Sequence, residues 1–297
     1  MADFDLEAMA KAAGINVPKV LAAIETTQAL ETELYAIIYP MISAYRQSLG
    51  YVEDTWGASQ VTQNVVKGML ATVASYGEQA VLTATPKVGQ WAERVEKWHR
   101  QRWSGVIKAA TRLDVSQILA AGDVQKLVEA TTQTNVGLIK GLSDDIYKRI
   151  EQTVWKAYAD GDGPAKLAKT LREKMEFAPA RAKLIARDQL GKYSGALDKA
   201  RHEEAGLEEY KWKTVGDDRV RPTHKANNGK RFSYKKKPPS TGHPGEDIQC
   251  RCKAQAILFS AAEEAELEAA GLGGLDRLPL GAHDARRGGR YRLFRAR

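Results

Sequence analysis

The sequence has few of the features that mark a secreted or disulfide-bonded protein. It contains two cysteines in 297 residues, Cys250 and Cys252. Two positions apart, they are poor disulfide partners because the geometry of that bond is demanding, so a reducing compartment is the simpler expectation. The first residues are acidic and lack the basic, apolar and cleavage-site order of a signal peptide. We therefore expect no cleaved leader and assembly in a cytoplasm.

Long apolar runs and familiar catalytic motifs are also missing. The longest apolar stretch covers residues 34–45 and is interrupted by Pro40, whereas a bilayer span needs about 20 residues. We therefore expect no membrane anchor. The sequence has no Gly-x-Ser-x-Gly elbow, P-loop, dinucleotide-binding fingerprint or His-Glu-x-x-His motif, each of which would point to a particular chemistry. No standard enzyme site is indicated.

The composition is that of a globular protein with a basic C-terminal third. Hydrophobic residues make up 43% and charged residues 28%, which excludes wholesale disorder. Residues 1–200 carry 25 basic and 23 acidic side chains, whereas residues 201–297 carry 20 and 14. A basic segment on a nearly neutral body favours an anionic partner, with nucleic acid as the first candidate.

Helical periodicity dominates the first two hundred residues. Apolar runs cover residues 20–49, after Pro18, and residues 60–82, and a third begins near Pro86. Shorter helices are expected at residues 165–174 and 179–205. In the third run Trp91, Val95 and Trp98 share a face, for which core packing is favoured over a recognition surface. The clearest stripe repeats every fourth residue, which places one helix face against a core: Leu138, Leu142, Ile146, Ile150, Val154 and Tyr158. Ser143 could cap a new helix within it.

Strand-like alternation begins after residue 207. Residues 210–215, 230–234 and 248–259 read as strands, with a turn signal at Asn228–Gly229 and a Lys-, Pro- and Gly-rich loop at residues 235–247. The predicted fold is mainly α, with a long-helix N-terminal body, a small α+β, β-rich C-terminal module and a basic tail. The expected divisions are 1–110, 111–206, 207–260, and 261–297 for an acidic helix and Arg-rich tail.

Several motifs occur in an order that resembles a known family. They begin with Asn135, Leu138 and Lys140 and continue through residues 150–168 and the segment 181–189, which contains Ile185, Arg187 and Asp188. The most specific part is Tyr210, Trp212, Thr214, Asp217, Arg219, Val220, Arg221 and His224, followed by Gly229 and Phe232, then His243–Pro244, then Cys250–Arg251–Cys252. This series resembles the Mu F-like phage head morphogenesis family, also called minor capsid or minor head proteins, over roughly residues 110–258.

The resemblance implies a low-copy protein of the phage head. Such proteins are associated with the portal vertex, procapsid assembly and genome handling, so the expected partners are portal protein, capsid proteins and packaged double-stranded DNA, bound without sequence preference. The expected location is the virion, in the head interior or at the portal vertex, and the host cytoplasm during assembly. Similar modules also occur fused to toxin domains, but no additional toxin-sized segment follows residue 260.

Two groups of residues could carry chemistry. His224, His243, Cys250 and Cys252 are four possible ligands for a structural zinc ion, and on a strand both thiols would point to the same side. The alternative is a metal-free cluster that is packed and hydrogen-bonded. Asp217 or Asp218 beside His224 could instead form the acid/base group of a metal-dependent nuclease or a toxin-like enzyme. The alternative there is a turn whose acids are neutralised by the adjacent arginines. No cofactor is certain, and we expect no enzymatic activity.

The basic residues are candidates for binding DNA or an acidic protein, because lysine and arginine meet phosphates by charge. The set in the module is Arg219, Arg221, Lys225, Lys230, Arg231, Lys235, Lys236 and Lys237, and the set in the tail is Arg286, Arg287, Arg290, Arg292, Arg295 and Arg297. The alternative is a solvated loop with a disordered tail.

Overall fold

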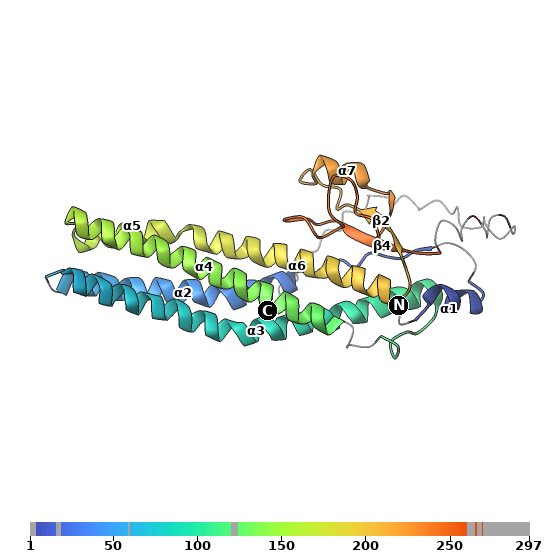
Figure 1. Cartoon of the computed structure of the whole chain (residues 1–297), viewed down its shortest axis with the longest axis horizontal. Helices are drawn as coiled ribbons and strands as arrows, with labels where there is room; N and C mark the ends of the chain where they lie inside the picture. The colour runs from blue at the N-terminus through green and yellow to red at the C-terminus, as the bar shows by residue number, and fades with distance from the viewer. Residues whose placement is uncertain are drawn as a thin grey trace, which may run out of the picture.

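A bundle of long helices forms the body of the protein. The computed structural model describes residues 4–15, 19–58, 60–119 and 124–259, together with residues 265 and 269. Helices α2 (Gln28–Ala58), α3 (Gln63–Thr111), α4 (Gln125–Asp160), α5 (Pro164–Met175) and α6 (Phe177–Glu204) lie side by side along one axis (Figure 1). Short helix α1 (Leu6–Ala12) lies near one end of the bundle. The prediction of a mainly α protein with long helices is confirmed.

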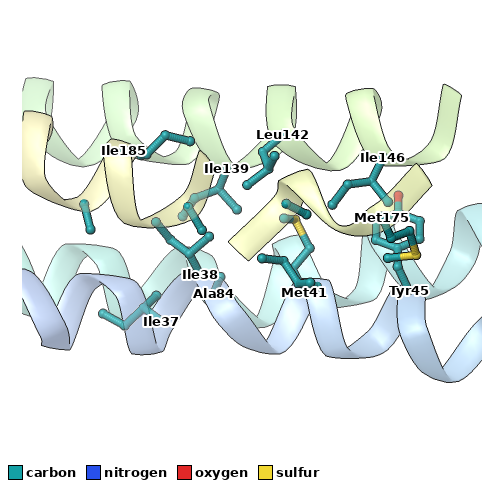
Figure 2. Close-up of a cluster of buried hydrophobic side chains, with 14 of the residues drawn as sticks. Ile37, Ile38, Met41, Tyr45, Ala84, Ile139, Leu142, Ile146, Met175 and Ile185 are labelled. Atoms are coloured by element: carbon teal, nitrogen blue, oxygen red, sulfur yellow. The ribbon is translucent and has the colours of Figure 1, made fainter. Parts of the chain in front are cut away.

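The bundle core is built from the apolar stripes that face one another. Ile38 and Met41 of α2, Ile139 and Ile146 of α4 and Ile185 of α6 meet in one cluster of buried side chains (Figure 2). The predicted stripe of α4 is buried from its second to its fifth member, while Leu138 is partly buried. An α-helix has 3.6 residues per turn, so a four-residue repeat drifts off the face at its ends. Tyr158 is accordingly exposed.

The helix boundary expected near Pro86 is wrong, and the possible second boundary at Ser143 is not formed. A single helix, α3, continues through Pro86, and α4 continues through Ser143. Proline inside a helix costs about 3 kcal/mol or more. Ala84 and Val88, two residues before and two residues after Pro86, are both buried in the core, and burial of apolar side chains offsets such a cost. Ser143 caps nothing. Its hydroxyl and carbonyl groups bind the Tyr45 hydroxyl of α2 at 2.9 and 3.1 Å.

The N-terminal boundary of the first long helix is also wrong. Residues 20–49 were expected to be helical, but strand β1 (Lys19–Val20) comes first and α2 begins at Gln28. β1 pairs antiparallel with β4 (Lys253–Leu258), and the Leu21 amide donates to the Ala256 carbonyl at 2.8 Å. Backbone pairing with a strand far along the chain thus overrides the local apolar periodicity.

A four-stranded antiparallel sheet with the order β1-β4-β2-β3 forms the C-terminal module, residues 207–259. Strands β2 (Glu209–Lys213) and β3 (Arg231–Ser233) confirm two strand predictions. The sheet lies on one side of the bundle, beside α6, and short helix α7 (Pro222–Asn227) lies over it (Figure 1). That helix was not predicted. The division of the chain into four regions stays a prediction, although β1 shows that the N-terminal region contributes to this sheet.

The third predicted strand is shorter than expected. β4 covers Lys253–Leu258, so Cys250 and Cys252 precede it. Gln249 has a positive φ of 56°, a conformation that turns the chain and is uncommon for residues other than glycine. The expectation that strand alternation aligns the two thiols is therefore wrong. They approach each other from an irregular segment instead. In the described part of the chain, no helix is both long and apolar enough to cross a bilayer.

Candidate metal centre and basic surface

Three of the four sequence-predicted metal ligands come together in a buried group, which we call the thiol–imidazole cluster: His224, Cys250 and Cys252. Their potential ligand atoms all lie within 4.8 Å of one another. His224 Nδ1 is 3.7 Å from the Cys250 sulfur and 3.5 Å from the Cys252 sulfur. Helix α7 supplies the imidazole, and the irregular segment before β4 supplies both thiols. The cluster joins two elements of a module whose own core is small.

The far side of the His224 ring is held by hydrogen bonds. Its Nε2 lies 2.8 Å from a carboxylate oxygen of Asp247 and 3.0 Å from the Thr241 hydroxyl. The Thr241 hydroxyl also donates to the same Asp247 oxygen at 2.5 Å, and these contacts lower the pKa of the Asp247 carboxyl. An ionised carboxylate at Nε2 favours the tautomer whose proton is on that nitrogen, which leaves Nδ1 with a lone pair facing the thiols.

The pKa values of the two thiols are shifted in opposite directions. A hydrogen bond from Cys252 lowers the pKa of the Cys250 thiol, and the Gly245 amide also donates to the Cys250 sulfur at 3.4 Å. The hydrogen bond with Cys250, together with burial, raises the pKa of the Cys252 thiol. The ring of Trp212 stands edge-on to the His224 imidazole, with centroids 5.3 Å apart. The cluster is therefore a buried polar site with the Trp212 ring on one side.

The fourth predicted ligand, His243, lies elsewhere. Its Nδ1 is 2.9 Å from the Tyr210 hydroxyl, and its ring contacts both Tyr210 and Tyr234. Burial lowers the pKa of His243, which favours a neutral ring within this aromatic group. The structure thus separates the two histidines that the sequence analysis had grouped together.

The candidate acid/base group does not assemble as a dyad. Asp217 forms a two-pronged ion pair with Arg251, at 2.6 and 2.7 Å, and this contact lowers the pKa of the Asp217 carboxyl. Asp218 is exposed. The carboxylate that binds His224 is Asp247, which the sequence analysis missed. Aspartate follows the His243–Pro244 motif closely in the chain, but nothing in the spacing indicated that it would reach His224.

The segment that carries the cluster is seated on one face of helix α6. The Gln249 amide donates to Asp188 at 2.6 Å, and Lys253, which is buried, donates to the Ser194 hydroxyl at 3.0 Å. Gly191 and Gly195 lie directly under the segment, because a Cβ atom at either position would come within 3.1 Å of its backbone. Helix α6 therefore approaches this segment backbone to backbone, which only glycine permits here.

The basic residues of the module are partly neutralised. Lys235 pairs with Glu208 at 2.7 Å and Lys237 with Glu246 at 2.8 Å. Arg231 lies 3.5 Å from Glu209. Arg221 donates to the backbone carbonyl of Ile248 at 2.5 Å.

Four further candidates in the module, Arg219, Lys225, Lys230 and Lys236, are exposed. Within the described ranges, no ion pair involves the three lysines among them. The six tail arginines lie outside the described residues. Within the described part of the module, the charge available for an anionic partner is therefore smaller than the sequence count suggests.

Comparison with known proteins connects this region to a phage family. Residues 148–255 match the family described as Phage Mu protein F like protein. The matched region runs from within α4 into β4. It therefore contains the face of α6 that supports the segment before β4, and the whole thiol–imidazole cluster. The resemblance stated from the sequence motifs is confirmed over these residues. The match shows that this region of the chain is similar to Phage Mu protein F like proteins.

A relative and the solved structures add little to this assignment. An uncharacterised protein of Haemophilus influenzae (strain ATCC 51907 / DSM 11121 / KW20 / Rd) is 35% identical over 153 residues, which cover 51% of this chain and 34% of that protein. The chain thus spans about a third of the length of this relative. No solved structure matches the chain.

Proposed function

We propose that this protein is a minor capsid, or head morphogenesis, protein that occupies the portal vertex of a phage head. The observation that carries the proposal is the match of residues 148–255 to the Phage Mu protein F like family. The portal and capsid proteins are the proposed partners, and the packaged double-stranded DNA is the proposed ligand of the basic residues. The virion is the proposed location, reached after assembly in the host cytoplasm.

The two parts of the structure suit different contacts. The elongated body offers long helix faces for neighbouring proteins (Figure 1). The C-terminal module offers exposed cations, among them Lys225, Lys230 and Lys236. Cations of this kind neutralise phosphates without reading bases, so binding to packaged DNA would be independent of sequence and sensitive to salt.

We propose that the protein binds without catalysing a reaction. The arrangement of Asp217 and His224 supports this, because Asp217 is occupied by Arg251 and the Nε2 of His224 is occupied by Asp247 and Thr241. Incubation of the full chain with plasmid DNA and Mg²⁺ or Zn²⁺ should give no more cleavage than the His224→Ala variant gives. Cleavage that the variant abolishes would establish the nuclease instead.

The location is tested with purified heads. Antibody detection or mass spectrometry of purified phage heads should find the protein in a fixed ratio to the portal protein. Heads that lack the protein entirely would contradict the proposal. Crosslinking in intact heads should join lysines of the helical body to the portal or to the capsid protein.

DNA binding is tested in a salt series. Each phosphate contact contributes about 0.9 to the slope of log K against log salt concentration. A variant with Lys225, Lys230 and Lys236 all changed to alanine should therefore show a slope reduced by about 3 if each lysine meets one phosphate. The matched control changes Lys67 and Lys140, which are exposed on α3 and α4, and should leave the slope unchanged. Equal slopes for both variants would remove the module from the DNA-binding surface.

A further inference from the structure

The thiol–imidazole cluster has the spacing of a metal site. A tetrahedral zinc ion has Zn–S bonds of about 2.3 Å and Zn–N bonds of about 2.0–2.1 Å, which separates a nitrogen ligand from a sulfur ligand by about 3.6 Å. The observed separations are 3.5 Å from His224 Nδ1 to Cys252 Sγ and 3.7 Å to Cys250 Sγ. Both nitrogen–sulfur separations therefore match those that one ion would impose, and the two sulfurs lie within 4.8 Å of each other.

The surroundings of the cluster are those that hold a metal-binding histidine in place. A ligating histidine usually donates its second ring N–H to a carboxylate or carbonyl group, which fixes the ring and the tautomer. Asp247 makes this contact with Nε2 of His224 at 2.8 Å, and the Thr241 hydroxyl donates to the same Asp247 oxygen at 2.5 Å. The nitrogen that faces the thiols is thus the one left free to bind an ion.

A second observation concerns Trp212, whose ring lies beside the cluster. The indole N–H of Trp212 is buried without a well-formed hydrogen bond among the described residues, although it lies close enough to act on the Cys252 sulfur. A buried donor without a partner carries a free-energy cost. A metal-bound thiolate accepts hydrogen bonds through its remaining lone pairs, and such a thiolate would give this donor a charged partner.

We propose that His224, Cys250 and Cys252 bind one Zn²⁺ ion through Nδ1 and the two thiolate sulfurs, with Asp247 as the residue that positions the imidazole. A small hollow beside the cluster, about 10 Å³ in volume and lined by Arg219, Arg221 and Gln249 among others, has room for about one water molecule as the fourth ligand. Mixed thiolate and imidazole ligands suit zinc better than the harder cations.

The ion would stabilise the module, and no base among the described residues lies beside it to support a hydrolytic reaction. The module core consists of few residues, chiefly Tyr210, Trp212 and Tyr234 with the cysteines. A metal ion that links α7 to the segment before β4 would therefore add stability that this small core does not provide. The residues that line the hollow are valine, arginine, glutamine, histidine and cysteine. A carboxylate to activate a metal-bound water is not among them, which favours a structural ion over a hydrolytic one.

Metal content is the first test. The full chain, purified under reducing conditions without chelator and without a histidine tag, should contain about one equivalent of zinc, because a structural site takes a single ion. The His224→Ala, Cys250→Ser and Cys252→Ser variants should lose it. The matched control is His243→Ala, which removes a buried imidazole of the same module outside the cluster and should keep the ion. Circular dichroism of each variant checks that the helical body is intact.

The role of Asp247 gives a second readout. Substituting Asp247→Ala should weaken zinc affinity by about 10–100-fold, the range found when a second-layer partner of a metal-binding histidine is removed. Competition with a chelator measures this loss. Chelator should also lower the melting temperature of the wild type and of His243→Ala but not of the cysteine variants.

Three results would overturn the proposal. The first is less than about a tenth of an equivalent of zinc in reduced wild-type protein after incubation with Zn²⁺, since a formed site would be filled. The second is equal loss of the ion in His243→Ala and His224→Ala. The third is a native protein whose mass, after thiol alkylation, shows Cys250 and Cys252 joined as a disulfide, because oxidised sulfurs do not ligate zinc as thiolates.

Discussion

The close contact between helix α6 and the segment that carries the cluster leads to a prediction about one glycine. Gly195 lies in the interior of α6, and a Cβ atom there would stand 2.5 Å from the Pro244 carbonyl oxygen and 3.1 Å from the Gly245 Cα. Ordinary Cβ contacts begin at 3.4 Å, so the segment must withdraw by about 0.9 Å to admit a methyl group. The obstacle is backbone rather than a flexible side chain, and it cannot rotate away. Overpacking of this kind costs about 1–3 kcal/mol.

The matched control is Gly141→Ala in helix α4. Gly141 is also inside a long helix, but a Cβ atom there meets nothing within 4 Å. Alanine is favoured over glycine in a helix by about 0.5–1 kcal/mol, and both variants receive this gain. The difference between Gly195→Ala and Gly141→Ala therefore reports the steric cost alone, about 1–3 kcal/mol in favour of the control.

Thermal unfolding of the full chain measures this difference. For large domains 1 kcal/mol corresponds to about 2–4 °C in melting temperature, so Gly141→Ala should melt slightly above the wild type and Gly195→Ala several degrees below the control. Urea unfolding should give the same order at unchanged slope. Equal stability of the two variants, or a more stable Gly195→Ala, would refute the close backbone approach between α6 and the segment.

Three further predictions concern the buried polar groups and contacts of the bundle. Burial lowers the pKa of His202 to about 4, against about 6.5 when unfolded, so the unfolded chain binds more protons between these values. The neutral His202 ring therefore contributes about 3 kcal/mol to the free energy of unfolding above pH 6.5, and this contribution is lost by pH 4. A His202→Gln variant should show a flatter dependence of stability on pH in urea unfolding. In the second, Gly77→Ala should destabilise by about 1–3 kcal/mol, because the new methyl group would overlap the Tyr45 hydroxyl, and Tyr45→Phe in the same chain should restore part of this loss. In the third, Glu96→Ala should cost about 3–5 kcal/mol, because it removes a partner of the fully buried Arg201; a loss below 1 kcal/mol would contradict the pairing.

The sequence predicted the helical body well because its signal is local. An apolar residue at every third or fourth position reports which face of a helix meets the core, and Leu142, Ile146 and Ile150 are all buried where the stripe places them. Short strands after residue 207 were predicted for the same reason. The continuity of α3 through Pro86 was not, since a proline weighs against a helix locally while the packing that outweighs it comes from other helices.

The candidate site was predicted only in part because its geometry is not local. Cys250 and Cys252 were identified as ligands for a reason that the structure contradicts, since they precede the strand that was to align them. His243 was included by residue type alone, and Asp247 was missed because its contact with His224 depends on how the segment folds back. Sequence spacing supplies the chemical types in a site, whereas the backbone path decides which of them meet.

The thiol–imidazole cluster and the contact with α6 depend on the same segment of the chain. The segment from His243 to Cys250 supplies the backbone that lies on Gly191 and Gly195, and it also carries Asp247 and one of the two thiols. A shift of this segment on the helix therefore changes the position of Cys250 relative to His224, which belongs to a different element. The two nitrogen–sulfur separations match a tetrahedral ion to within a few tenths of an ångström. A displacement of about 0.9 Å at Gly195 is therefore large enough to disrupt them. The small residues of α6 thus act on the proposed metal centre through the segment that they support, although α6 itself contributes no ligand.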